Sequence, residues 1–236
     1  MSNGRCPRTE LTGVAGVAET ALSEALLHSL PDNQAPAPWR CRLSSLVWLG
    51  RGGRAAAGAL PPRLARSPAL ATIGGFVRYT ETPVGGYDEV FGVVASRSGL
   101  QPWGSVAFMA VDSTTSLVGG RANWAMPKTL ARFDGEPGPR QTITATGSDQ
   151  TPWMISATPR IVGPGIPLKT RGTARQQFAD GRIGESVLIF TGRVRPAVVT
   201  VTVSSGGALP TWLRPGRHVG VVVDSGVFTL GSPSFQ

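Results

Sequence analysis

Two lysines occur in a chain that otherwise carries its positive charge on arginine. Of the 23 lysines and arginines, only Lys128 and Lys169 are lysine. Arginine keeps its proton, whereas a buried lysine can lose one and then attack a ketone to form a Schiff base. Lys128 lies in the apolar segment 123–130, where Trp124 and Met126 precede it. This setting predicts a buried, uncharged amine; the alternative is a lysine at the surface beside a turn.

A carboxylate and an arginine are candidates to act with this amine. Residues 83–89 contain two glycines that turn the chain, and Tyr87 and Glu89 follow them at the start of a predicted strand. Glu89 could move protons during the reaction, or it could cap the glycine turn. Arg42 enters the first predicted strand and could hold a substrate carboxylate or orient Glu89, unless it is a surface arginine.

Four further residues complete the candidate site. Trp124 and Met126 would form a dry wall around the amine, although apolar residues in such a segment usually belong to the core. Tyr87 could face the pocket or the core. We expect Arg121 to brace the loop before Lys128 rather than to touch the substrate.

Composition limits the class of protein. The 236 residues are 41% hydrophobic, and no apolar run is long enough for a membrane span, so we expect a cytoplasmic protein without a membrane partner. The net charge is +9, but the arginines are scattered and only 7% of residues are aromatic. This pattern does not indicate a nucleic-acid-binding protein; a positive field would equally favour an anionic substrate.

Neither cysteine nor histidine indicates a metal site or a disulfide. Cys6 and Cys41 are far apart in sequence, and so are His28 and His218. We therefore predict no metal and no organic cofactor, because a Schiff base would itself supply the electron sink.

Turn residues and short apolar runs predict the fold class. We expect one domain over residues 1–236, mainly β (α+β), with an antiparallel, barrel-like sheet and a few short peripheral helices. Residues 1–13 are predicted to be disordered, and helices are predicted at 14–30, 52–60 and 173–180. Strands are predicted at 43–49, 70–80, 89–95, 104–111, 116–119, 141–145, 153–158, 186–190, 197–204 and 218–223.

Two segments together resemble the acetoacetate decarboxylase family. Residues 83–89, Pro-Val-Gly-Gly-Tyr-Asp-Glu, are similar to a family stretch that ends in Tyr-x-Glu. Residues 120–128 contain Gly-Arg and end in Pro-Lys, like the family segment that holds the Schiff-base lysine. The spacing between the two matches without a gap, and the same register places Arg42 at the family's active-site arginine, with Arg40 as the alternative. The likeness covers about residues 36–132.

Departures from the family pattern concern charged residues. Thr129 stands where well-known members have a second lysine, so desolvation alone would have to keep Lys128 uncharged. Ala122 replaces a glutamate, and Gly74 falls near the position of a second acid. These losses put acetoacetate itself in doubt as the substrate.

The resemblance implies a Schiff-base lyase that acts on a small keto acid or related keto compound, most simply by decarboxylation. The same imine chemistry could instead serve aldol condensation, dehydration or cyclisation in a biosynthetic pathway. A noncatalytic β-barrel that binds a small molecule is a further alternative. Family members commonly assemble, so a homo-oligomer is expected.

Overall fold

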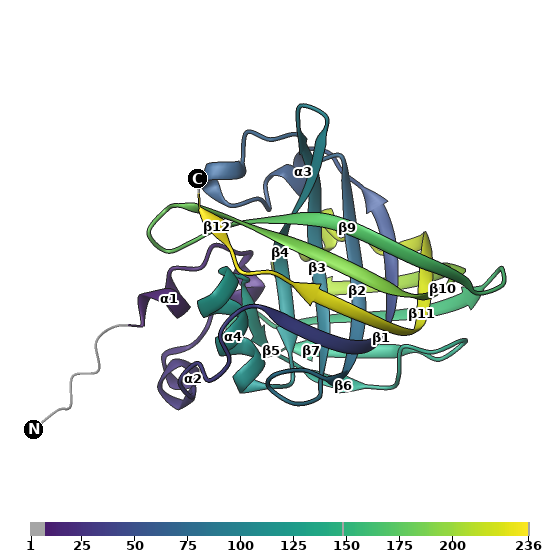
Figure 1. Ribbon diagram of the computed structural model, residues 1–236, viewed down its shortest axis with the longest axis horizontal. Helices are drawn as coiled ribbons and strands as arrows, with labels where there is room; N and C mark the ends of the chain where they lie inside the picture. The colour runs from purple at the N-terminus through teal and green to yellow at the C-terminus, as the bar shows by residue number, and fades with distance from the viewer. Residues whose placement is uncertain (1–7, 148, 236) are drawn as a thin grey trace, which may run out of the picture.

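The computed structural model describes residues 8–147 and 149–235 (Figure 1). Within these residues, twelve strands belong to one sheet. In chain order the strands are β1 (Trp39–Arg51), β2 (Ala71–Glu81), β3 (Tyr87–Ser98), β4 (Gln101–Val111), β5 (Lys128–Leu130), β6 (Arg132–Asp134), β7 (Ile143–Gly147), β8 (Trp153–Ile161), β9 (Ile166–Gln177), β10 (Ile183–Ser205), β11 (Gly216–Leu230) and β12 (Ser234–Phe235).

Seven of these strands close into a ring. Neighbours follow the order β11-β1-β2-β3-β4-β9-β10, and β10 pairs again with β11. The pairings are antiparallel except at β4 and β9, which run parallel and meet at Gly104 and Ala174. From Ala197 to Ser205, β10 pairs with β8, and β7 and β6 extend the sheet beyond β8. Over Ala197–Val201, β10 remains paired with β11 as well. The predicted class, mainly β with a barrel-like sheet, is confirmed.

Short helices gather at one end of the ring, where α1, α2 and α4 lie together in Figure 1. The helical segments are α1 (Thr9–Thr12), η1 (Ala18–Thr20), α2 (Glu24–Ser29), α3 (Arg54–Ala57), η2 (Pro62–Leu64), α4 (Thr114–Trp124) and α5 (Leu209–Trp212). Each helix in the described part of the chain falls short of the length and hydrophobicity that crossing a bilayer requires.

The N-terminal predictions need correction. Residues 1–7 lie outside the described residues, but the expectation of disorder is wrong for residues 9–12, which form α1 and bury Leu11 fully. The predicted helix at 14–30 is broken into η1 and α2. Glu19 is drawn into the core, where it accepts hydrogen bonds from the Leu209 backbone and the Ser205 hydroxyl. These contacts hold the chain in two short segments instead of one helix.

Two internal predictions were wrong in the type of element. Residues 116–119 belong to α4, because β4 and β5 are parallel neighbours and such strands need a crossover connection, commonly a helix. Residues 173–177 belong to β9, which pairs antiparallel with β10 from Gln177 opposite Ile183 onward. The helix predicted at 52–60 is present only as the single turn α3.

Hydrophobic cores lie on both faces of strands β1 to β4. Phe76 belongs to a core that is shared with β7, β8 and α5, whereas its neighbour Val77 faces the other core, inside the ring. Successive residues of a strand point to opposite faces, so both faces of the central strands are buried. The ring interior contains Trp39, Cys41, Tyr79, Tyr87 and Leu117.

Candidate active site

Lys128 lies inside the ring at the end covered by α4. It begins β5, opposite Met109 of β4, and it is 3% exposed. Its Nζ donates to Glu89 Oε2 over 2.9 Å and to Ser116 Oγ over 2.9 Å. The amine is therefore buried, as imine chemistry requires, but a carboxylate and a hydroxyl meet it rather than apolar atoms alone.

Glu89 reaches the amine from β3, opposite Val77 of β2. Its carboxylate is 4% exposed as a side chain, and its second oxygen accepts a 3.3 Å hydrogen bond from the Tyr79 hydroxyl. One oxygen thus faces the lysine and the other is held by a phenol. The carboxylate can accept a proton from the amine without leaving its place.

Aromatic side chains enclose the amine. The ring centroid of Tyr87 lies 5.1 Å from Nζ, and that of Trp39 lies 6.0 Å away. Trp124 packs edge-on against Trp39, with its indole N–H donating to the Gly231 carbonyl over 2.8 Å. Trp124 and Met126 are buried, so Trp124 supports the wall around the amine from behind Trp39.

The stem of Lys128 fits against a glycine of α4. A Cβ added at Gly120 would lie 2.5 Å from both Cδ and Cε of Lys128. Ser116 is four residues earlier in the same helix, on the same face. Helix α4 therefore supplies both a hydroxyl for the amine and the space for its aliphatic chain.

Arg121 is buried but points away from the amine. Its guanidinium donates to three backbone carbonyls, those of Lys128 (2.6 Å), Leu11 (2.5 Å) and Thr20 (2.5 Å). Burial lowers the pKa of Arg121 to about 10. Through these bonds it fixes the backbone of Lys128 and ties the N-terminal segment to α4.

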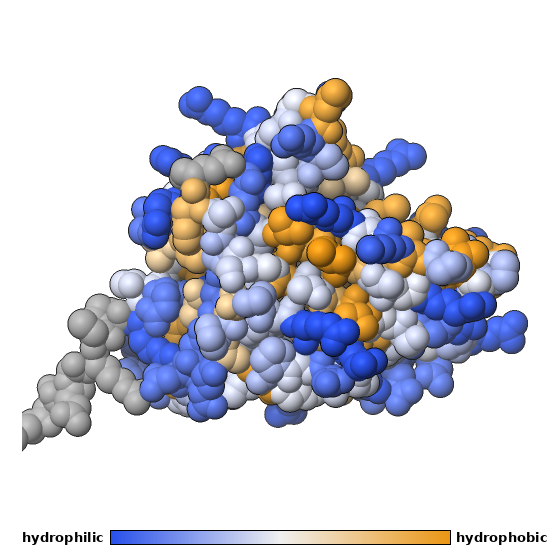
Figure 2. Space-filling model, viewed as in Figure 1, coloured by the Kyte–Doolittle hydropathy of each residue, from blue (hydrophilic) through white to orange (hydrophobic). Residues whose placement is uncertain are grey.

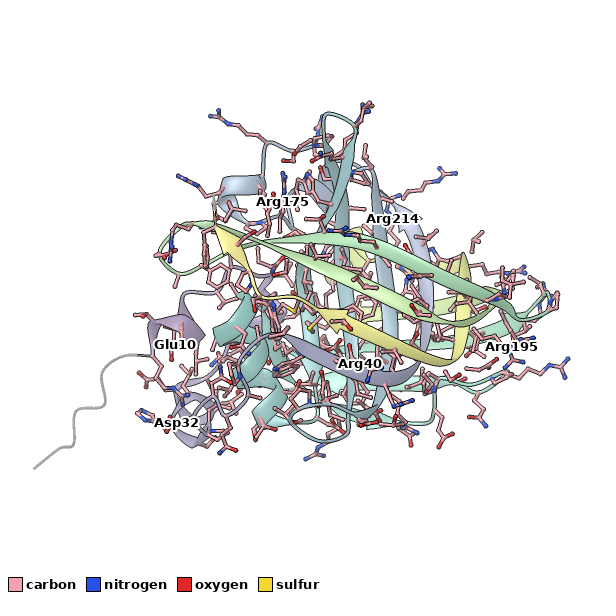
Figure 3. All side chains as sticks on the ribbon, in the orientation of Figure 1. Glu10, Asp32, Arg40, Arg175, Arg195 and Arg214 are labelled. Carbon is pink, nitrogen blue, oxygen red and sulfur yellow. The ribbon has the colours of Figure 1, made fainter. Side chains whose placement is uncertain are left out.

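Arg42 is not brought together with Lys128 and Glu89. It lies on the outer face of β1, where its side chain is 59% exposed and pairs with Glu81 over 2.8 Å. Arg40, the alternative, is also exposed, and Figure 3 shows it beside the β1 ribbon. The inward position between these two arginines is taken by Cys41.

Burial and the nearby carboxylate keep three groups of the site protonated. Burial, reinforced by Glu89 and opposed by Lys128, raises the pKa of Cys41 from 9.0 to about 12. Burial and Glu89 also raise the pKa of Tyr79 and the pKa of Tyr87 well above the ordinary value. Both phenols and the thiol thus remain neutral hydrogen-bond donors at physiological pH.

Sequence reasoning missed four residues around the amine, which are Ser116, Tyr79, Trp39 and Cys41. Ser116 was placed in a predicted strand, although Ser113 caps the helix by accepting from the Ser116 backbone N–H. The other three come from β1 and β2. Alternate residues of these strands face the same side of the sheet as Glu89, and this alternation was the signal that could have identified them. Among the described residues, no group of three or more His, Cys, Asp or Glu could hold a metal ion.

Comparison with known proteins identifies the family. A model of the family described as "Acetoacetate decarboxylase (ADC)" matches residues 52–199, which is more than half of the chain. The chain belongs to the acetoacetate decarboxylase family. No curated protein matches it in sequence.

Solved structures show the fold of this family over most of the chain. The acetoacetate decarboxylase from Legionella pneumophila is 16% identical, with a TM-score of 0.59, and the match covers 88% of this chain and 92% of that one. An acetoacetate decarboxylase-like enzyme from Sphingomonas wittichii is 14% identical, with a TM-score of 0.61 and coverage of 86% and 93%. The enduracididine biosynthesis enzyme MppR is 16% identical, with a TM-score of 0.60 and coverage of 85% and 90%.

The two positions at which the resemblance implies an acid, 74 and 122, lie in different surroundings. The Trp48 ring lies against Gly74, where an added Cβ would come within 2.7 Å of the indole nitrogen. Ala122 is half-buried in α4. Glu89 is therefore the carboxylate that contacts the lysine of this member of the acetoacetate decarboxylase family.

Proposed function

We propose that this protein is a Schiff-base-forming enzyme that acts on a small keto acid or related keto compound through Lys128. The observation that carries the proposal is the buried contact of Lys128 Nζ with Glu89 and Ser116, both at 2.9 Å. Family membership supports the reaction class. The other lysine, Lys169, is exposed on β9 and has no comparable surroundings.

The first step is transfer of a proton from Lys128 to Glu89. The buried pair is neutral overall before and after this transfer, so no net charge has to be created in the ring interior. A neutral amine next to a carboxylic acid results. Without the carboxylate, the proton would have to leave the interior altogether. Acceptance of this proton is the role that makes Glu89 a catalytic residue.

The amine then attacks the keto carbon, and Glu89 returns a proton as water leaves the carbinolamine. The resulting iminium takes up the electron pair of the breaking carbon–carbon bond when a β-carboxylate departs as carbon dioxide. The enamine that remains is protonated at carbon, and water hydrolyses the new iminium to a ketone and free Lys128. Ser116 and Tyr79 hold the amine and the carboxylate in line during these steps.

A condensation reaction is the second candidate. MppR has been solved with pyruvate and with the condensation product of pyruvate and imidazole 4-carboxaldehyde. The same iminium in this protein would lose a neighbouring proton instead of carbon dioxide, and the enamine would attack an aldehyde. Because Ala122 stands where the family resemblance implies an acid, aldol, dehydration and cyclisation chemistry stay candidates beside decarboxylation.

Borohydride trapping tests the proposal. The protein is incubated with acetoacetate and, separately, with pyruvate; borohydride is added, and the modified peptide is located by mass spectrometry. We expect a reduced adduct on Lys128, no adduct in Lys128→Ala, and an unchanged adduct in the matched variant Lys169→Ala. Measurement of carbon dioxide release and of condensation products with an added aldehyde then separates the two reactions.

Absence of an adduct with a broad panel of keto compounds would contradict the proposal. That outcome, combined with saturable binding of a keto acid, would favour a noncatalytic binding protein. An adduct on both lysines would indicate nonspecific reaction. We further propose a homo-oligomer, which sedimentation would test by giving a mass above that of the 24.6 kDa chain.

A further inference from the structure

A hollow of about 610 Å³ lies on the outer face of the ring, apart from the lysine site. It is lined by residues of β1, β2, β10 and β11, and neither Lys128 nor Glu89 is among them. Its two cationic lining residues are Arg42 and Arg193. The volume falls within the range of small-molecule sites.

Cross-strand pairing arranges cations in rows around this hollow. In one row, Arg42 is opposite Val227, which is opposite Thr191, which is opposite Lys169. In the next row, the same strands bring Arg40, Thr229, Ile189 and Arg171 into register. Figure 2 shows hydrophilic side chains around apolar ones on the face over β9, β10 and β11. Directly opposed residues share a face of the sheet, so these cations point outward together.

Few carboxylates balance these cations. Arg42 pairs with the exposed Glu81, and Asp224 is engaged by Arg195. Within the described part of the chain, no carboxylate lies within ion-pair distance of the cations at 40, 169, 171 and 193. Such a face holds a positive potential that favours an anion and opposes contact with a second copy of itself.

Irregular strand pairing supplies further donors at the same place. The register shifts between Leu43 and Ser45 on β1 and between Arg193 and Val194 on β10. The pairing of β1 with β2 also shifts, between Arg42 and Leu43. Thr80 is left unmatched between β1 and β2, and Asp224 is left unmatched between β10 and β11. Ser44 and Ser225 are unmatched only between β1 and β11, and all four residues line the hollow. Bulges release backbone groups from the ladder and re-aim side chains, and they are enriched beside binding sites.

We propose that this hollow binds the phosphate or diphosphate group of a small molecule, with Arg42 and Arg193 as the charged donors and the surrounding hydroxyls as neutral donors. Guanidinium forks match the geometry of phosphate oxygens. A phosphate also offers more acceptor oxygens than a carboxylate, which suits the three hydroxyls of Ser44, Thr191 and Ser225. The Thr80 hydroxyl also lines the hollow but donates to the Arg42 carbonyl over 3.4 Å. The site is separate from Lys128, so the proposal stands whether or not the lysine forms an imine.

Calorimetric titration with inorganic pyrophosphate tests the site in the full-length protein. We expect saturable binding at one site, weakened about tenfold or more in Arg193→Gln and in Arg42→Gln, as loss of a charge-assisted hydrogen bond implies. Arg193→Lys keeps the positive charge but loses the forked guanidinium group. Its affinity for pyrophosphate should lie between that of the unaltered protein and that of Arg193→Gln. The matched control is Arg51→Gln, which removes an exposed arginine nine residues along β1, or about 30 Å away in an extended strand.

Three outcomes would overturn the proposal. Equal weakening by Arg51→Gln and Arg193→Gln would mean diffuse attraction to the net charge. Tighter binding of citrate than of pyrophosphate would mean a carboxylate site. A single-stranded oligonucleotide that displaces pyrophosphate and binds far more tightly would mean a nucleic-acid surface. Thermal unfolding of each variant, compared with the unaltered protein, shows that any lost affinity is not lost folding.

Discussion

At the scale of single residues, the buried pair of Lys128 and Glu89 dominates the site. Removing one partner leaves a charge buried without its counter-ion, whereas removing both does not. We therefore expect Lys128→Met and Glu89→Gln each to lower the free energy of unfolding by about 3–5 kcal/mol. The double variant should lose clearly less than the sum, because neither charge is stranded. Urea unfolding measures all three, and strictly additive losses would contradict a direct pair.

The thiol of Cys41 predicts how the free energy of unfolding depends on pH. Because its pKa rises from 9.0 to about 12 on folding, the folded protein keeps the thiol proton where the unfolded chain has lost it. The free energy of unfolding should then fall as pH rises from 9 to 12, by up to about 4 kcal/mol from this group. Cys41→Ala should remove that part of the alkaline decline. An identical decline in the variant, measured by urea unfolding across the range, would assign it to other groups.

Residue types and spacing predicted part of the site. Lys128, Tyr87 and Glu89 could be singled out because they lie in two short segments with informative neighbours. Arg42 shows the limit of this reasoning. Aligning the sequence with the family motifs can identify a strand, but an error of one residue in that alignment places a side chain on the opposite face of the sheet. Cys41 occupies the inward position, and only pairing with β2 and β11 determines that phase.

At the scale of elements, α4 determines how the lysine is held. Its sequence contains Gly119 and Gly120, which weaken a helix, and residues 116–119 were predicted as a strand. Ser113 as an N-cap was the local sign of a helix, and the parallel pairing of β4 with β5 explains why one is needed there. Tertiary packing outweighs the low helix propensity of glycine here, because Gly120 leaves room for the aliphatic chain of Lys128.

Gly120→Ala separates helix propensity from this packing. Alanine would favour the helix by about 1 kcal/mol in isolation, but its methyl group would displace Lys128 Cδ and Cε. A displacement near 1 Å can slow a reaction about 100-fold, so borohydride trapping should slow strongly. Gly58→Ala is the control, since the nearest atom to its added Cβ is 3.4 Å away. Equal trapping in both variants would mean that Gly120 has no part in placing the amine.

The junction of β4 with β9 depends on a buried side chain. Gln176 accepts from the Ser105 hydroxyl and the Val106 backbone, and it donates to the carbonyls of Val106 and Ala125. Gln176→Leu leaves several of these groups unpaired, at about 1–3 kcal/mol each, so we expect a loss of at least about 3 kcal/mol in unfolding free energy. Gln101→Leu changes an exposed glutamine at the start of β4 and should be nearly neutral. A small loss in Gln176→Leu would show that water replaces the missing bonds.

At the scale of the whole molecule, the sequence predicted the class of fold but not the order of its strands. Two predicted strands, 186–190 and 197–204, are parts of the single strand β10, which is 23 residues long. Its first half pairs with β9, its second half pairs with β8, and β11 pairs with parts of both halves. Pairing between strands that are far apart in sequence depends on how both hydrophobic cores are buried at once. Local sequence patterns do not predict it. The first half of β9 was missed because its exposed residues lack an apolar alternation, and its second half was predicted as a helix.

The net charge of +9 belongs to the molecule as a whole, and it predicts a weak, salt-sensitive affinity for polyanions. Counter-ion release makes such binding fall steeply with salt, so an oligonucleotide held at about 0.05 M salt should be released by about 0.3 M. We expect no preference for sequence, because the arginines are dispersed over many strands and loops. Fluorescence anisotropy with two unrelated oligonucleotides measures both properties, and neutral dextran of similar size serves as the control. Binding that resists salt and discriminates between the two sequences would require a built nucleic-acid surface, and the outer face of β9, β10 and β11 would then be the first place to look for it.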